Sequence, residues 1–158
     1  MKTSIGISTK NRQLIVVELI KILADENLLS LKTKHAHWNI EGPDFFEKHS
    51  FFELQIGQLD KLIDNIAERI RTLGHYAPAT MKAYLELTHL TEKSKGKNDS
   101  QSFIKELLGD HDSIIIILRE HCNLFADKYH DIGTSNFITD LMEKHEKMAW
   151  FLRSHLAN

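Results

Sequence analysis

The chain is poor in residues that interrupt regular structure, with two prolines and seven glycines among 158 residues. It has one cysteine, Cys122, so no disulfide can form within the chain, and a reducing compartment is the simpler expectation. The most apolar run, "SIIIIL" at 113–118, is far shorter than a transmembrane helix. Glu18 and Lys21 interrupt the apolar N-terminal segment, which argues against a secretory signal. We therefore expect a soluble, cytoplasmic protein.

The composition is that of a globular, helix-rich protein, with 42% apolar and 27% charged residues. The net charge is −2 with histidine neutral, so nothing indicates a bulk attraction to nucleic acid or to an anionic membrane. We expect residues 1–158 to form a single domain that begins with a short tail at 1–9. The ten histidines are the unusual feature, and they raise the question of metal ligands.

Two long helical patterns occupy the first half of the chain. The first covers about residues 10–38, with apolar side chains at helical spacing: Leu14, Val17, Ile20, Ala24, Leu28 and Leu31. The second follows the Gly42-Pro43 break, where Asp44 and Glu47 have the spacing of a capping box. It continues to Gly74, a residue suited to ending a helix.

A long connection and two further helical patterns make up the second half. Residues 80–90 predict a short helix, and the lysine-rich segment 91–100 predicts a mobile loop. A third helix starts near Asp99, and a fourth starts after Gly133-Thr134. The predicted fold class is all-α, a four-helix bundle with a short extra helix in the long crossover between helices two and three.

One stripe of the second helix carries five side chains that can bind metal: His49, Glu53, Asp60, Asp64 and Glu68. An α-helix turns ~100° per residue, and all five fall within ~100° of one another around its axis. Apolar neighbours such as Phe52, Leu59 and Ile63 flank the stripe, and carboxylates in such surroundings are usually paired or bound to a metal. For any single residue, a solvated acidic face is the alternative.

The stripe divides into two half-sites. Glu53 and Asp64 lie ~16 Å apart along one helix. Metal bonds to nitrogen or oxygen are only ~2.0–2.2 Å long, so one ion cannot contact both residues of one chain. Two copies of this helix, crossing antiparallel about a two-fold axis near Gln58, would join the two half-sites of different subunits. The histidine and glutamate of one chain would then meet the aspartate and glutamate of the other.

His37 lies at the end of the first helix and can fold back toward the second helix as a further imidazole ligand, with Trp38 walling off the site. The alternative for His37 is a helix-end histidine that bonds only to the backbone. A mixed set of imidazoles and carboxylates suits iron or another borderline divalent metal better than calcium or a closed structural zinc site.

Three segments, "AHWNIEG" (36–42), "FFEKHSFFE" (45–53) and "DKLIDNIAERIRTLG" (60–74), resemble in this order the signature of the Dps family, the mini-ferritins. The segment 133–156 resembles the family's last helix, so the resemblance covers essentially the whole chain. It implies a ferritin-like bundle assembled as a hollow dodecamer. It also implies that Fe(II) is oxidised between subunits, usually by hydrogen peroxide, and that ferric mineral is stored inside, which protects the cell from oxidative damage.

By position, the resemblance implies five ferroxidase ligands: His37, His49, Glu53, Asp64 and Glu68. The family commonly has aspartate or glutamate at the position of Glu53, and Trp38 matches the aromatic residue beside the centre. The first three ligands belong to one subunit and the acidic pair to its mate, in agreement with the spacing argument.

The pore through which iron enters such a shell is less clear in this sequence. Asp127 fits one position of the family's aspartate-lined pore, but Asn136 stands where an aspartate is frequent. Asp131 and Asp140 are candidate substitutes. DNA binding in some members uses a lysine-rich tail, whereas residues 1–12 here carry only three basic side chains. DNA therefore stays an open partner, since so few charges bind weakly unless twelve tails act together.

Two other protein classes compete with this interpretation. A larger ferritin holds its iron within one bundle and uses two Glu-x-x-His motifs, but this chain has one match, at 86–89. A structural or nucleoid-associated oligomer without strong ferroxidase activity is the non-enzymatic alternative. His145 and Cys122 both lie at apolar positions, and we expect a hydrogen-bonded core histidine and a buried, inert thiol.

Overall fold

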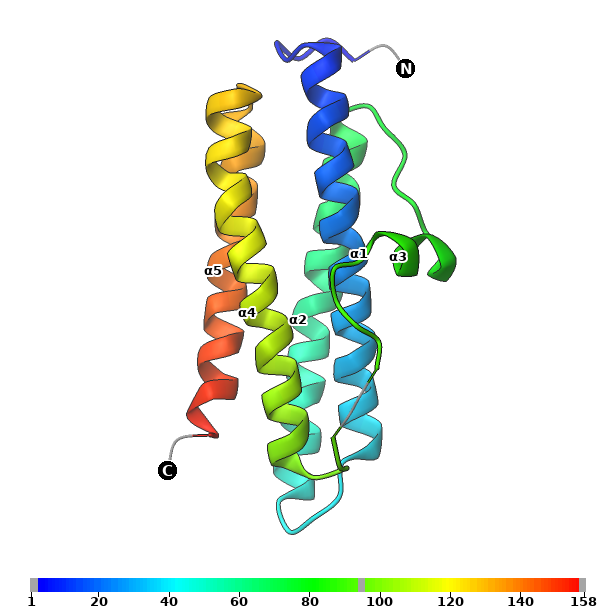
Figure 1. The fold of residues 1–158 in the computed structure, drawn as a ribbon, viewed down its shortest axis with the longest axis vertical. Helices are drawn as coiled ribbons and strands as arrows, with labels where there is room; N and C mark the ends of the chain where they lie inside the picture. The colour runs from blue at the N-terminus through cyan, green and yellow to red at the C-terminus, as the bar shows by residue number, and fades with distance from the viewer. Residues whose placement is uncertain (1–2, 94–95, 157–158) are drawn as a thin grey trace.

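The computed structural model describes residues 3–93 and 96–156 (Figure 1). All regular structure in these residues is helical: α1 (Thr9–Asn39), α2 (Phe45–Thr72), α3 (Met81–Leu87), α4 (Ser100–Asn123), a π-helical turn η1 (Leu124–Lys128) and α5 (Ile132–Ser154). Four long helices run side by side, and the short α3 lies outside them against α1 (Figure 1). The predicted four-helix bundle with an extra helix in the crossover is confirmed. No helix of the described residues is long and apolar enough to cross a membrane.

Of the four long helices, two start where the sequence predicts, and the starts of the other two differ from the prediction. Ser8 caps α1 and Asp99 caps α4, each accepting a backbone N–H three residues later. The capping box predicted for α2 is wrong. Asp44 makes no side-chain capping bond, because its backbone is not in the extended conformation of a cap (φ −100°, ψ 16°), and Glu47 pairs with Lys48 instead. The start of α5 is also earlier than predicted, since Asp131 is its cap.

The buried face of α1 is only partly the predicted one. Ala24 and Leu28 are buried, but Leu14, Val17 and Leu31 are 37%, 41% and 40% exposed. Another series at three- and four-residue spacing is almost completely buried: Ile15, Leu19, Ile22, Glu26, Leu29 and Thr33. α1 packs against α2, α3 and α4 at once, so it offers more than one apolar stripe. Helical periodicity alone therefore could not identify the innermost stripe.

A chain of three buried polar side chains crosses the middle of the bundle. The Nε2 atom of His145 lies 2.6 Å from Oε1 of Glu26, and its Nδ1 atom lies 2.9 Å from Nδ1 of His111. All three residues are 0% exposed. Burial, and then the nearby His145, hold the pKa of His111 well below its ordinary value, so its imidazole stays neutral. The prediction of a satisfied core histidine at position 145 is confirmed.

Cys122 differs from its prediction. It is half-buried rather than buried, and its Sγ lies 3.3 Å from the Thr139 hydroxyl. The predicted mobile loop at 91–100 includes residues 94 and 95, which lie outside the described part of the chain.

A buried carboxylate fastens the crossover to the bundle. Asp25 on α1 is 1% exposed and accepts hydrogen bonds from the Thr88 hydroxyl (2.6 Å) and the His89 backbone N–H (2.7 Å). The His89 ring lies 3.1 Å from the same carboxylate. Glu86 pairs with Lys82 instead, so the two ends of the Glu-x-x-His match have different partners.

Candidate metal-binding half-sites

The turn between α1 and α2 brings His37 and His49 together. The Nδ1 atom of His37 lies 2.9 Å from the carbonyl oxygen of His49, and the Nδ1 atom of His49 lies 2.8 Å from the carbonyl oxygen of His37. The two rings stack with centroids 3.8 Å apart and planes inclined by 20°. Because a carbonyl oxygen can only accept, each Nδ1 must carry the proton. In the neutral rings, both Nε2 atoms therefore keep a lone pair, which is the form of imidazole that binds a metal.

This geometry combines the two alternatives that the sequence left open for His37, a metal ligand and a helix-end histidine bonded to the backbone. His37 is hydrogen-bonded to backbone, as a structural helix-end histidine would be, and it also folds back onto the start of α2. A backbone carbonyl at Nδ1 is the usual device for orienting a metal-binding histidine, because it selects the tautomer and holds the ring in place. The backbone bond is thus compatible with a ligand role.

The aromatic side chain that stacks on the pair is Phe45, which the sequence analysis did not select. Its ring lies 5.2 Å from that of His49, inclined by 29°. Phe45 and His49 are four residues apart on α2, a spacing that could have revealed the contact. Trp38, the expected aromatic wall, is 66% exposed and lines a separate cavity beside His35. Its position in a single chain leaves it free to face another molecule.

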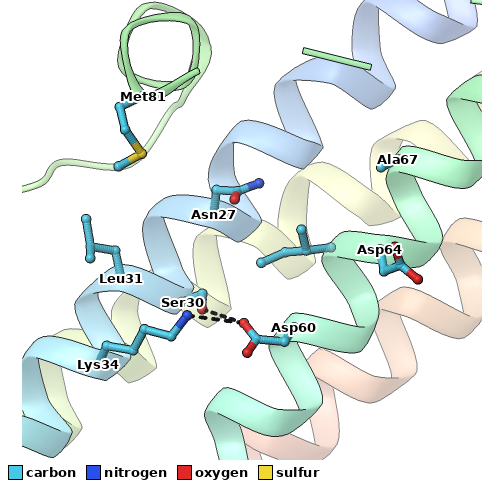
Figure 2. Close-up of a pocket in the computed structure, with 9 residues that line it drawn as sticks. Asn27, Ser30, Leu31, Lys34, Asp60, Asp64, Ala67 and Met81 are labelled. Atoms are coloured by element: carbon cyan, nitrogen blue, oxygen red, sulfur yellow. Dashed lines mark hydrogen bonds and ion pairs between the residues drawn. The ribbon is translucent and has the colours of Figure 1, made fainter. Parts of the chain in front are cut away.

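The acidic half lies about four turns further along α2. Asp64 and Glu68 are exposed, and no hydrogen bond or ion pair of either is found within the described residues. Asp64 borders a cavity of about 440 Å³ between α1 and α2 (Figure 2). The neighbouring Asp60 differs, because it accepts from the Ser30 hydroxyl at 3.1 Å and pairs with Lys34 at 3.4 Å. Figure 2 shows the Asp64 carboxylate apart from this cluster.

A single chain does not assemble a complete site. Among the described residues, no three histidine, cysteine, aspartate or glutamate side chains are gathered in a way that would hold a metal ion. The two histidines meet, Glu53 is exposed one turn beyond them, and the pair Asp64 and Glu68 lies farther along the same helix. The stripe is therefore two separate groups of donors.

The candidate pore residues lie near the opposite end of the bundle. Asp127 is exposed in the π-helical turn, and Asn136 and Asp140 are exposed on α5. Asp140 pairs with Lys144 at 2.5 Å. Asp131, one of the proposed substitutes, is 3% exposed, caps α5 and lies 3.3 Å from Arg69. Its carboxylate is thus engaged within the fold.

Comparison with known proteins gives a consistent result along the whole chain. The ferritin-like domain family matches residues 17–158. A low temperature-induced protein of Nostoc sp. is 39% identical over 155 residues, which cover 98% of this chain and 87% of that protein. A DNA protection during starvation protein of Helicobacter pylori is 34% identical over 141 residues, or 89% of this chain and 97% of the relative.

A solved structure gives the same picture in three dimensions. The crystal structure of the Dps protein from Vibrio cholerae superposes with a TM-score of 0.91 at 30% identity, covering 99% of this chain and 98% of the other. That protein is described as a member of a broad superfamily of ferritin-like diiron-carboxylate proteins.

Proposed function

Because the chain belongs to the Dps family of ferritin-like proteins, we propose that it is a mini-ferritin that oxidises Fe(II), with hydrogen peroxide as the preferred oxidant. The family role is iron storage and DNA protection. The specific proposal is a ferroxidase in a cytoplasmic dodecamer, built from residues 1–158 as one domain, with ferric iron stored inside the shell.

The reciprocal hydrogen bonds between His37 and His49 are the observation that carries this proposal. They orient two imidazoles in parallel and leave the same nitrogen, Nε2, available on each ring. A packing role alone does not require this shared tautomer. Two neutral imidazoles side by side, with a carboxylate one helical turn away at Glu53, form a donor set that suits Fe(II).

The second half-site would come from a partner chain. Asp64 and Glu68 are exposed and unpaired within the described residues, so their charges are available to a cation. Large apolar side chains accompany the stripe on the surface of α2, with Phe46 80% and Leu54 71% exposed. Exposed apolar groups of this size mark a contact surface, and a second copy of α2 would cover them. An isologous pairing then creates two identical sites.

The chemistry assigned to such a site is a balanced electron transfer. Two Fe(II) ions, as substrate, each give up one electron, and peroxide accepts both as its O–O bond breaks. Two protons are taken up, and two water molecules form. Carboxylates favour the product because they stabilise the higher charge of Fe(III). Delivering both electrons to one peroxide avoids release of a hydroxyl radical.

An assembly and oxidation experiment tests the proposal. The purified chain is sized by chromatography with light scattering, and Fe(II) oxidation by peroxide is followed optically. We expect a dodecamer whose oxidation rate far exceeds that of iron in buffer. Asp64→Ala should lower the rate to the buffer level. Asp60→Asn is the matched control, since it removes a carboxylate charge four residues away that already has partners within the chain, and it should keep the rate.

A dodecamer that oxidises iron only at the buffer rate would contradict the enzyme and support the alternative, a structural DNA-protecting oligomer. Equal losses in Asp64→Ala and Asp60→Asn would show that general negative charge, and not the proposed ligand, is responsible.

A further inference from the structure

A third cavity opens on the α5 side of α2 and has the opposite electrostatic character to the half-sites. Its volume is about 280 Å³. Three lysines border it, Lys61 from α2 and Lys144 and Lys147 from α5, together with Gln58 and Asn65. The buried side chains of Leu62 and Met148 complete its wall. Three lysine residues thus line one concave space in a chain whose net charge is −2.

The positive charge of this cavity is only partly neutralised. Lys144 pairs with Asp140 at 2.5 Å. For Lys61 and Lys147, no ion pair is found within the described residues. Lysine side chains that line one cavity repel one another, and a bound anion relieves this repulsion. A concave surface also concentrates the positive field, which attracts an anion. Lysine and carboxamide side chains both offer N–H donors, which are the groups that an oxyanion accepts.

We propose that this cavity, bounded by Lys61, Lys144 and Lys147, binds inorganic phosphate. One water occupies about 30 Å³ of liquid, so the cavity has the volume of roughly nine waters. A phosphate ion with part of its hydration shell fits this space. The small volume of this pocket favours a small tetrahedral oxyanion over the extended backbone of a nucleic acid, which needs a continuous groove.

The position of the cavity connects it to iron, and this step rests on the proposed ferroxidase function. Lys61 lies three residues before Asp64, and Asn65 directly follows it. By helical geometry, they stand ~60° and ~100° from Asp64 around α2, on the flank of the metal stripe. Phosphate held there would meet Fe(III) close to where it forms, so that iron is stored as ferric phosphate.

Two-fold symmetry strengthens this arrangement. In an antiparallel pair of α2 helices, the symmetry axis is perpendicular to both helices and to the line between them. A rotation about this axis leaves the same flank of each helix on the same side of the dimer. The two phosphate cavities would therefore lie on the same side of the dimer.

Phosphate binding is tested by calorimetric titration of the assembled, iron-free protein with inorganic phosphate at constant ionic strength. We expect saturable binding at one site per chain. Lys147→Gln should weaken it by about tenfold or more, the loss of one charged hydrogen bond. Lys105→Gln, which changes an exposed lysine on α4, is the matched control and should leave the affinity unchanged. The triple variant with glutamine at 61, 144 and 147 should show no saturable binding.

Three outcomes would overturn the proposal. The wild-type chain could show no saturable heat, or the Lys105 and Lys147 variants could weaken phosphate binding equally. In the third, substituting the cavity lysines leaves the phosphate affinity unchanged and lowers the affinity for duplex DNA. The single variants suffice if the triple variant fails to assemble. Asp64→Ala separates this proposal from the ferroxidase, because it should bind phosphate normally while failing to oxidise iron. A lower phosphorus-to-iron ratio in mineral formed by Lys147→Gln would establish the link between the two.

Discussion

The imidazole of His37 donates to the backbone carbonyl of His49, and the imidazole of His49 donates to the backbone carbonyl of His37. This exchange joins the last turn of α1 to the second turn of α2 through two bonds of 2.9 and 2.8 Å. Each ring therefore has one nitrogen that fastens the fold and another that is available for chemistry.

Two substitutions of His49 can distinguish the role of its Nδ1 atom from that of its Nε2 atom. Asparagine can place an N–H near the position of Nδ1, whereas glutamine reaches toward the position of Nε2. Both His49→Asn and His49→Gln should lose rapid Fe(II) oxidation, because neither supplies an imidazole. The asparagine variant should be the more stable by about 1 kcal/mol, the value of one retained hydrogen bond. Thermal unfolding of the assembled variants measures the difference, and the reverse order would show that the Nδ1 bond is dispensable.

Shared half-sites predict complementation between two inactive variants. Asp64→Ala keeps the histidine half, and His49→Ala keeps the acidic half. Shells co-assembled from equal amounts should place two intact halves together at about a quarter of the sites, because each half is intact in half of the chains. The oxidation rate should recover to about that fraction, measured against each variant alone. Mixed shells that stay as inactive as the separate variants would place the whole site within one chain.

The buried His111 predicts a loss of stability in acid. Its pKa is well below the ordinary value of 6.5 in the folded protein, because burial and His145 disfavour its charged form. At pH below about 6.5, the unfolded chain binds a proton that the folded chain refuses, so stability is full above this pH and falls below it. Thermal midpoints of the wild-type chain should drop from pH 7.5 to pH 5.

His111→Leu provides the comparison, since the variant lacks the titrating group and should show a shallower fall over the same pH range. It will also be less stable at pH 7.5, because His145 loses the partner of its Nδ1 atom. Parallel curves for the two proteins would mean that other groups set the acid sensitivity.

The carboxylate of Asp25 predicts a local effect on the crossover. Asp25→Ala leaves the donors of Thr88 and His89 without an acceptor, at a cost of about 3 kcal/mol. We expect a lower denaturation midpoint and faster tryptic cleavage after Lys93, because the segment is no longer fastened to α1. Glu86→Ala, which removes an exposed pair on α3, should change the stability by less than about 0.5 kcal/mol. Unchanged cleavage in Asp25→Ala would show that packing alone holds the crossover.

The helices were predictable because their signals are local. Capping residues and apolar periodicity depend on neighbours a few residues away, so Ser8, Asp99 and Gly74 marked real helix ends. Local signals failed where backbone conformation decided whether a residue caps a helix, and where contacts with several helices decided which face is buried. Asp44 has capping chemistry but not the capping conformation, and Leu14 lies at a helical apolar spacing but outside the core.

The sequence by itself determined which residue types lie on one stripe of the second helix, since an α-helix converts spacing into direction by a constant rotation. It also determined that one chain keeps the two donor groups apart, because the distance along a helix follows from the count of residues. Only the tertiary structure decided the tautomers of His37 and His49 and the lysine cavity between α2 and α5. These depend on how two helices approach each other, which arises from packing among residues far apart in the chain.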